Sequence, residues 1–192
     1  MSRTKEFDEA EVLGKALELF RDRGFKATSF SNLTSALGVS RQSLYDTYGN
    51  KETLFLAALK RYMAVAQEGV RAALADPAPV RKVLAGMFDR VICNSCDNGA
   101  RGCLMANTMV ELAPNVPSAR GLAVEHARAL EGLFASRLSA AQRKGDLKRG
   151  KDPVALARYL HHVIIGLSVA SRAIDDKETL RQSARLALQA LD

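Results

Sequence analysis

The chain of 192 residues lacks most features that mark secreted, membrane or fibrous proteins. Its cysteines, Cys93, Cys96 and Cys103, are an odd number, so we expect reduced thiols and no disulfide framework. No run approaches about 18 uninterrupted apolar residues, and the N-terminal segment MSRTKEFDEAEV contains no apolar stretch. The sequence also lacks alternating strand patterns, internal repeats and low-complexity tracts. We therefore expect a cytoplasmic, all-α protein without a membrane partner.

Signatures of catalysis and of metal binding are lacking as well. There is no G-x-S-x-G motif, and none of the three histidines stands beside a nucleophile signature. Cys93 and Cys96 form one closely spaced ligand pair, to which Cys103 and either His126 or His161 would add, whereas a structural zinc site normally has two such pairs. We expect no enzyme activity, no metal and no cofactor.

The positive charge of the chain does not locate a binding site. The net charge is +7, yet residues 1–50 contain seven Lys or Arg and seven Asp or Glu, a difference of zero. Much of the excess lies between Arg137 and Lys151, where six basic residues face only Asp146. We interpret this run as a solvated loop between helices, so a nucleic-acid site has to be sought in local patterns.

Apolar residues recur at helical spacing almost throughout. In the first 50 residues, Gly24 is expected to end a first helix, Thr28-Ser29 to cap a second that ends at Gly38, and Ser40 to cap a third. Two short helices joined by a glycine-containing turn, with a helix before them, predict a helix-turn-helix domain over residues 1–50. Residues 51–192 are expected to form a helical bundle with helices at roughly Lys51–Leu74, Val80–Cys93, Cys103–Leu112, Pro117–Lys144, Pro153–Ala173 and Lys177–Leu191.

The third predicted helix buries Val39 and Leu44 and leaves one polar face exposed. That face consists of Arg41, Gln42, Ser43, Asp46 and Thr47. In the major groove, Arg bridges two acceptors of guanine, Gln pairs with adenine, and Ser and Thr donate to several bases. We expect phosphate contacts from groups at the edges of this helix, namely Tyr45, Tyr48, Lys51 and the backbone amides near Thr28-Ser29 and Asn50.

From Phe7 to Leu59, and most closely over GFKATSFSNLTSALGVSRQSLYDTYGNKETLF (Gly24 to Phe55), the sequence resembles the DNA-binding domain of the TetR/AcrR family of bacterial transcriptional regulators. The segment RGCLMANTMVELAP (Arg101 to Pro114) is similar to a subset of that family. The resemblance implies an all-helical homodimer whose N-terminal helices bind a double-stranded DNA operator and whose C-terminal helices hold a small-molecule effector. By motif position it implies phosphate contacts from Thr28, Ser29, Tyr45, Tyr48 and Lys51, and base contacts from Arg41, Gln42 and Ser43. With the helix cap Ser40 and the polar-face residue Thr47, these form the predicted DNA-binding set.

Two other interpretations stay open at this point. The polar face of the third helix is also typical of an ordinary solvated helix. It would equally suit a helical protein-interaction module that binds a groove on another protein without binding DNA.

Two seams near the C-terminus predict a dimer interface. The first is heptad-like and consists of Leu156, Leu160, Val163, Leu167, Ala170 and Ile174; the second consists of Leu180, Ala184, Ala187 and Leu191. Gly166 and Ala170 would allow a close helix crossing, and two such helices from each subunit would form a four-helix interface. The alternative is that both seams serve the subunit's own core. A two-fold axis at this interface would set the recognition helices one DNA turn apart and predicts a pseudo-palindromic operator.

A regulated DNA-binding protein needs a cavity whose ligand prefers the state that does not bind DNA. The residues that we expect to surround it are Met63, Met87, Phe88, Cys103, Met105, Met109, Phe134, His161 and His162. Methionines at helical spacing also suit a plain core. Cys103 lies at a predicted helix start, two residues after Arg101, where the helix dipole and the cation favour a thiolate that senses electrophiles or oxidants. A buried, inert thiol is the alternative at this position.

Overall fold

The structure is a computed structural model. It describes the backbone of residues 7–97 and 103–192, and the side chains of these residues except 95–97. Within these ranges the chain forms nine α-helices and one short 3-10 turn, with no strand, as the sequence predicted.

The first three helices are α1 (Glu9–Ala27), α2 (Phe30–Leu37) and α3 (Arg41–Tyr48). Ser29 caps α2 through a reciprocal capping box with Asn32, and Gly38 ends it in the left-handed conformation (φ 67°, ψ 25°). The hydroxyl of Ser40 caps α3 by accepting from the backbone N–H of Ser43 at 3.1 Å. The predicted turn between two short helices is therefore confirmed.

Gly24 breaks α1 at the position where the sequence predicts a helix end, although a short further turn follows it. Gly24 interrupts it with φ 77° and ψ 171°, a conformation that side chains with a Cβ rarely adopt, and the helix resumes to Ala27. The break removes a normal i→i−4 partner from the backbone N–H of Phe25, which instead donates to Oε2 of Glu111 at 3.2 Å. A side chain 86 residues further along the chain thus sustains the break.

The remaining helices are α4 (Lys51–Leu74), α5 (Val80–Asp97), α6 (Leu104–Glu111), α7 (Pro117–Lys144), α8 (Pro153–Ala170) and α9 (Lys177–Leu188), followed by η1 (Gln189–Leu191). Helices α4 and α7 have the predicted bounds. Helix α5 extends beyond the expected Cys93, and α8 ends three residues earlier than expected, at Ala170. These differences lie at helix ends, where capping and fraying blur the sequence pattern.

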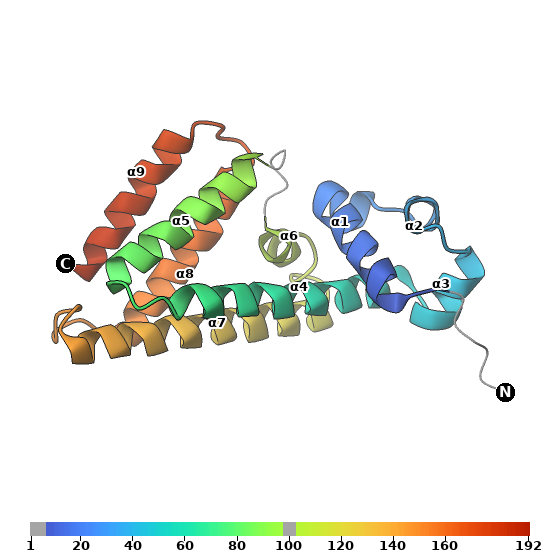
Figure 1. Cartoon of the computed structure of the whole chain (residues 1–192). Helices are drawn as coiled ribbons and strands as arrows, with labels where there is room; N and C mark the ends of the chain where they lie inside the picture. The colour runs from blue at the N-terminus through green and yellow to red at the C-terminus, as the bar shows by residue number, and fades with distance from the viewer. Residues whose placement is uncertain (1–6, 98–102) are drawn as a thin grey trace.

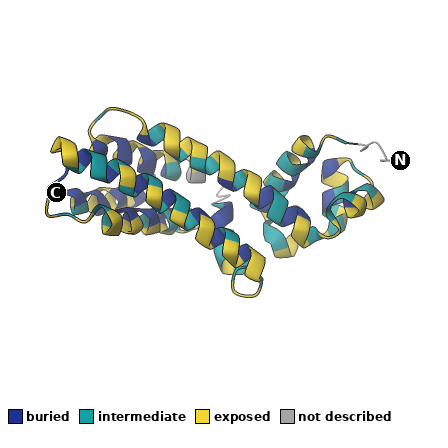
Figure 2. Cartoon of the chain, turned by 90° about the horizontal axis from the view of Figure 1, so that it is seen from below, coloured by how far each residue is buried: buried dark blue, intermediate teal, exposed yellow. Residues whose placement is uncertain are grey.

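The molecule is elongated, and α4 and α7 run side by side along its length (Figure 1). Helices α1 to α3 surround one end of α4, whereas α5, α8 and α9 pack at the other end, and α6 lies between the two parts (Figure 1). Buried residues form an inner layer in both parts (Figure 2). The apolar interior accordingly consists of two clusters, a first one in the helix-turn-helix part and a second one in the C-terminal part.

Polar residues separate the two clusters on both long helices. On α7, Ala123 belongs to the first cluster and Leu130 to the second, and His126 lies between them. On α4, Met63 belongs to the first cluster and Leu74 to the second, with Gln67 between them. The Nε2 atom of Gln67 lies 3.5 Å from Nδ1 of His126, so these two side chains meet at the boundary.

Most of the residues predicted to form a dimer seam lie in the subunit's own core or pack against it, whereas Ile174, the last residue of the first seam, is 37% exposed. Leu160 is fully buried, Leu167 is 4% exposed, and the second predicted seam is buried with them. A second set of residues on α8 lies one position before each α8 residue of the first predicted seam, has the same heptad-like spacing, and is exposed. We call this set the outer face of α8, and it consists of Ala155, Tyr159, His162, Gly166 and Val169. The heptad-like spacing correctly predicted an apolar stripe on α8. The stripe that contains the leucines, however, packs inside the subunit and not against a second one.

Helix α8 is also long and apolar enough, by length and composition alone, to cross a membrane, and one third of that stretch is buried. A single helix of this kind is weak evidence, because core helices of soluble proteins pass the same test.

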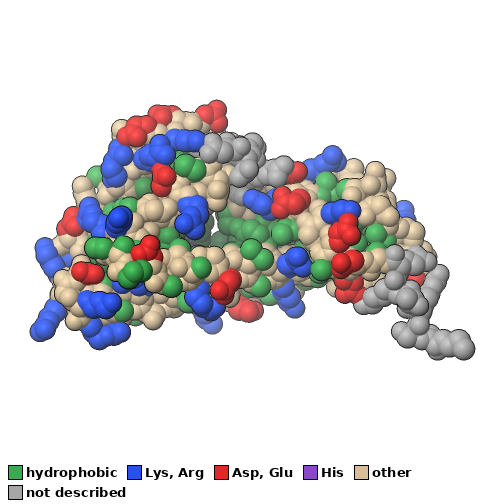
Figure 3. Space-filling view, in the orientation of Figure 1, with side chains coloured by type: hydrophobic (Ala, Val, Ile, Leu, Met, Phe, Trp, Pro, Cys, Tyr) green, Lys and Arg blue, Asp and Glu red, His purple; other side chains and the backbone are tan. Residues whose placement is uncertain are grey.

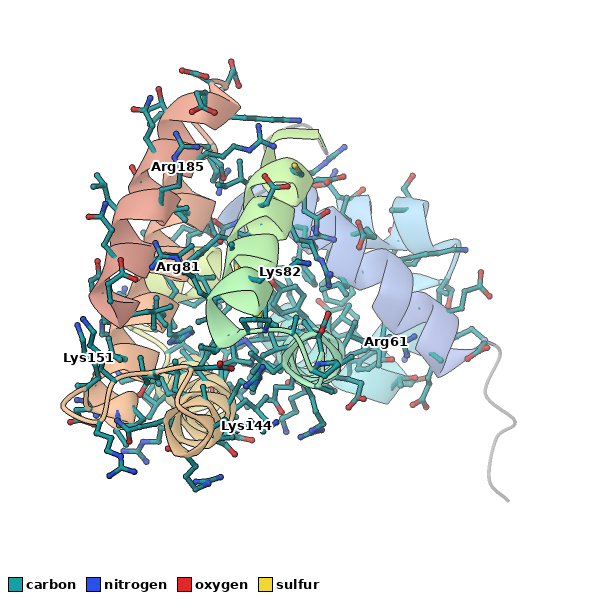
Figure 4. The ribbon with its side chains drawn as sticks, turned by 60° about the vertical axis from the view of Figure 1, so that its left-hand side comes forward. Arg61, Arg81, Lys82, Lys144, Lys151 and Arg185 are labelled. Atoms are coloured by element: carbon teal, nitrogen blue, oxygen red, sulfur yellow. The ribbon has the colours of Figure 1, made fainter. Side chains whose placement is uncertain are left out.

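Part of the basic run after Arg137 has structural partners. Arg137 donates to the carbonyl oxygen of Ala78 at 2.6 Å, and Nζ of Lys151 donates to the carbonyl oxygen of Ala190 at 3.0 Å. In Figure 4, the labelled side chains Lys144 and Lys151 lie at the end of the molecule formed by α7 and the loop that follows it. These two contacts connect that end to the segment before α5 and to the C-terminal 3-10 turn. Since Arg137, Arg143 and Lys144 also lie within α7, the interpretation of the whole run as a solvated loop is wrong.

Candidate nucleic-acid interface and effector region

Helix α3 is anchored by one fully buried side chain, that of Leu44. Truncating a buried leucine to alanine typically costs about 2–5 kcal/mol. Because α3 has only eight residues, this anchor and the Ser40 cap set its orientation. The opposite side of the helix is left to solvent.

The predicted base-reading residues lie on that side. Arg41 and Gln42 are exposed, and Ser43 is half-buried. Nε2 of Gln42 donates to Oδ1 of Asp46 one turn later, at 2.7 Å, which fixes the orientation of the amide. Thr47 is half-buried, and its hydroxyl donates to the carbonyl oxygen of Ser43 at 2.9 Å. The exposed surface of α3 therefore presents hydrogen-bonding groups of the types that read base edges.

Two other helices begin beside α3. The cap residues Ser29 of α2 and Asn50 of α4 are both exposed, and Oδ1 of Asn50 accepts from the backbone N–H of Thr53 at 2.8 Å. The first turn of a helix carries partial positive charge and free N–H groups, both of which favour phosphate. Residues 1–50 therefore need no net positive charge to attract a DNA backbone at these two points.

Two predicted phosphate contacts have internal partners in the structure. Thr28 is fully buried, and its hydroxyl donates to the carbonyl oxygen of Gly24 at 2.7 Å, so its side chain is not accessible to a phosphate in this conformation. Nζ of Lys51 donates to the carbonyl oxygens of Phe25 and Thr28 at 2.9 Å and 2.8 Å and lies 4.2 Å from the centroid of the Phe25 ring. Burial lowers the pKa of the Lys51 ammonium. Lys51 thus caps the end of α1, a role that the sequence did not reveal.

The two tyrosines of α3 differ in environment. Tyr45 is 38% exposed at the edge of the helix. Tyr48 packs partly against the first cluster, its hydroxyl is buried without a hydrogen-bond partner, and burial raises the pKa of this phenol. Tyr45 is the more accessible of the two predicted phosphate contacts.

The predicted effector residues do not form one group. Met63 and Met105 belong to the first cluster, and Cys103 and Met109 pack against it. Met87, Phe88 and Phe134 belong to the second cluster. His161 is 3% exposed, whereas His162 lies on the outer face of α8 and is exposed. The expectation that all of these residues line one cavity is therefore wrong.

Cys103 contacts a polar group that the sequence analysis missed. It is the N-cap residue of α6, half-buried, and its Sγ lies 3.2 Å from the hydroxyl of Tyr62 on α4. Burial, followed by the interaction with Cys103, raises the pKa of Tyr62 well above its usual value. Arg101 lies outside the described residues.

The interior also contains two histidines that are neutral near pH 7. Burial, and to a lesser extent His161, lowers the pKa of His126 to about 4. Burial likewise lowers the pKa of His161, against the opposing effect of Glu131, whose Oε1 lies 3.5 Å from Nδ1 of His161. With Tyr62 and Gln67, these residues line the boundary between the two clusters with uncharged polar groups.

Figure 3 shows that the molecule is hollowed between its two parts and that hydrophobic side chains line the wall of this hollow. Two surface clefts lie elsewhere. One of about 690 Å³ is bounded by the α6–α7 turn and α7, and one of about 670 Å³ lies between α4 and α5 and includes Met87. Among the described residues, no group of three or more His, Cys, Asp or Glu side chains could hold a metal ion; the side chain of Cys96 lies outside this description.

A three-helix domain with a capped, polar and exposed third helix, followed by a helical bundle, defines the class of helix-turn-helix DNA-binding proteins. Residues 12–58 match the family model described as bacterial regulatory proteins, tetR family, and residues 79–187 match that of the tetracyclin repressor-like C-terminal domain. The chain belongs to the TetR family of transcriptional regulators. It is a DNA-binding regulator and not an enzyme.

Relatives resemble the chain over its whole length. The HTH-type transcriptional regulator YezE of Bacillus subtilis (strain 168) is 34% identical, with 100% of both chains covered. The HTH-type transcriptional repressor ComR of Escherichia coli (strain K12) is 32% identical, over 97% of this chain and 90% of that protein. A solved cysteine mutant of the TetR family regulator CifR, complexed with 26-base-pair double-strand operator DNA, has a TM-score of 0.87 at 27% identity, with 100% of both chains covered.

Proposed function

We propose that this regulator is a cytoplasmic repressor. It binds a pseudo-palindromic operator in duplex DNA as a homodimer and leaves it when a small molecule binds, or a thiol is modified, in the C-terminal part. The observation that carries the proposal is the exposed polar face of α3, which lies beside the capped beginnings of α2 and α4. The relative ComR, described as a repressor, and the operator complex of CifR support it.

In this proposal the side chains divide into two groups by the part of DNA that they meet. Arg41, Gln42 and Ser43 read base edges in the major groove. The beginnings of α2 and α4, together with exposed hydroxyls, hold phosphates and fix the register of the helix. These phosphate contacts come from Ser29, Ser40, Tyr45 and Thr47. The hydroxyl of Tyr48 is buried, and the ammonium of Lys51 bonds to backbone carbonyls, so neither is assigned to a phosphate in this conformation.

The outer face of α8 is the part of the surface that we assign to the homodimer. Tyr159 and Val169 on this face are 45% and 47% exposed, and Leu186 on α9 is 64% exposed. Gly166 lies among them, and a Cβ at this position would have no atom within 4 Å, so a second helix can approach closely. A two-fold axis at this face would bring two α3 helices to about 34–36 Å, one turn of DNA.

Helix α6 supports a route for release. Cys103 at its beginning contacts Tyr62, and Glu111 at its end accepts from the backbone of α1. A bulky adduct on Cys103, or a ligand bound between the two parts of the molecule, would displace α6 and disturb the end of α1. Such a ligand weakens DNA binding only to the extent that it prefers the displaced state.

Selection of bound sequences from a random pool of duplex DNA tests the proposal. We expect a pseudo-palindromic motif, with log affinity falling linearly with log salt concentration. Recovery of no motif, together with an affinity that does not depend on salt, would instead support the protein-interaction alternative.

Alkylation with iodoacetamide tests the thiol route. We expect the treated protein to bind the selected DNA more weakly, and the Cys103→Ser variant to bind equally well before and after treatment. If treatment weakens the variant as much as the unaltered chain, Cys103 is not the responsive thiol. If treatment weakens neither, release proceeds without thiol modification.

A further inference from the structure

An aromatic pair connects α2 with α3 beside the reading face. The ring centroids of Phe30 and Tyr45 are 4.4 Å apart, and the rings are nearly parallel, with an interplanar angle of 5°. The guanidinium carbon of Arg41 lies 5.6 Å from the centroid of Phe30 and 5.5 Å from that of Tyr45. Nη2 of Arg41 is also 3.5 Å from the hydroxyl of Tyr45. We call these three side chains the Phe30 stack.

The three members of the stack are held to different degrees. Phe30 is half-buried and packs against the first cluster, so its ring has a fixed base. Tyr45 and Arg41 are exposed, and neither would be expected to keep one orientation alone. The immobile ring therefore orders the exposed ring, and both rings order the guanidinium.

Contact with aromatic rings suits a side chain that has to read a base. Aromatic faces attract a guanidinium through the ring quadrupole, an interaction that uses none of its N–H donors. The hydroxyl of Tyr45 accepts from one N–H of the guanidinium, so four of the five N–H donors in the rigid fork remain for a partner, and guanine O6 and N7 match two of them. An arginine that is already ordered loses less freedom on binding than a mobile one.

We propose that Phe30 is a specificity-determining residue that acts by positioning Arg41. Through the stack with Tyr45, it holds the guanidinium in the orientation that reads one guanine of the operator, without itself touching the DNA. The inference rests on the proposed binding of DNA by α3. It assigns to α2 a part in base selection in addition to its phosphate contact.

The sequence alone does not reveal this role. Together with Leu33 and Leu37, Phe30 has the spacing of a core residue. If Phe30 were only a core residue, leucine could replace it without changing the base preference. The flat ring is what distinguishes the two roles, because only an aromatic side chain can stack on Tyr45.

The test is selection from a random DNA pool with the full chain and four variants. Arg41→Ala first identifies the base position that Arg41 reads. We expect Phe30→Leu to lose preference at that same position by about two- to tenfold, the effect of releasing one ordered side chain. Phe30→Tyr keeps the flat ring and is expected to keep the preference. The slope of log affinity against log salt should be unchanged in both, because no phosphate contact is removed.

Phe25→Leu is the matched control. Phe25 is half-buried in the same domain and contacts Phe20, Phe55 and Lys51 instead of Arg41. We expect this variant to lower the free energy of unfolding in urea, and any loss of affinity to be equal at all base positions. A loss confined to the Arg41 position is thus the signature of positioning.

Three results would overturn the inference. The first is a Phe30→Leu variant with the preference of the unaltered chain, and the second is a uniform loss at all positions, as for Phe25→Leu. The third is an Arg41→Ala variant with no base position affected, since Arg41 would then read no base. The first two results leave the proposed function as it stands, and the third removes only Arg41 from the proposed base contacts. The proposed binding of DNA itself fails only if the unaltered chain selects no DNA.

Discussion

Glu111 of α6 accepts a hydrogen bond from the backbone N–H of Phe25 in α1, at 3.2 Å. Its carboxylate lies directly against Gly24, where an added Cβ would come within 2.7 Å of Oε1. The break in α1 and the contact with the C-terminal part are therefore the same feature. It connects the domain that reads DNA with the helix that begins at Cys103.

We expect Gly24→Ala to lower the free energy of unfolding by about 1–3 kcal/mol, because a Cβ is strained at φ 77° and meets Glu111. Unfolding in urea, followed by circular dichroism, measures the change. Gly14→Ala is the matched control in the same helix, since a Cβ there has nothing within 4 Å. It should be neutral or stabilising by up to about 1 kcal/mol. Equal effects of the two variants would contradict the assigned strain.

Lys51→Met separates two roles of Lys51. If the ammonium mainly caps the carbonyl groups of Phe25 and Thr28, its loss should cost about 2 kcal/mol in urea unfolding. If it mainly contacts a phosphate, the slope of log affinity against log salt should fall by about 0.9 with stability unchanged. We expect the loss of stability to dominate. Lys60→Met, at an exposed position on α4, provides the baseline for removing a lysine.

Gly166→Glu tests the outer face of α8. A Cβ at Gly166 has open space in the subunit, so the variant should fold, whereas a carboxylate buried in a dimer interface is strongly unfavourable. We expect sedimentation to give a dimer for the unaltered chain and a monomer for Gly166→Glu. Gly132→Glu makes the same change at an exposed position on α7 and should leave the dimer intact. A dimeric Gly166→Glu variant would move the interface elsewhere.

The buried histidines predict loss of stability in mild acid. His126 has a pKa of about 4 when folded and 6.5 when unfolded, so the unfolded chain binds the extra proton between these values. The contribution of His126 to the free energy of unfolding is then fully present above about pH 6.5. It is lost as the pH falls toward 4, which lowers the free energy of unfolding by up to about 3 kcal/mol.

Urea unfolding at several pH values measures this dependence. His126→Gln should flatten the curve relative to that of the unaltered chain. A curve that is the same for the His126 variant and the unaltered chain would mean that His126 is protonated equally in both states.

The sequence predicted the helices well where local chemistry ends them. Ser29, Ser40 and Asn50 begin helices through their own side chains, and Gly38 ends one through its own backbone. The sequence also predicted the break at Gly24, but not the group that sustains it, because Glu111 is distant in the chain. Local signals are visible in a window of a few residues, and partners supplied by the fold are not.

The candidate sites were predictable to different degrees. The polar face of α3 follows from the burial of Leu44 and needs no further information. The roles of Lys51 and Thr28 were not visible, because their partners are backbone carbonyls of the broken helix. On α8, two apolar stripes differ by one residue, and heptad spacing alone does not say which of them faces the chain's own core.

The polar boundary at Gln67 and His126 has a practical consequence for any denaturation experiment. Because it keeps the two apolar interiors apart, either interior can lose its packing while the other persists, and melting need not occur in one cooperative step. A probe near Phe55 and a probe near Phe134 would then report different midpoints. Free energies obtained from a single signal would belong to one half of the molecule.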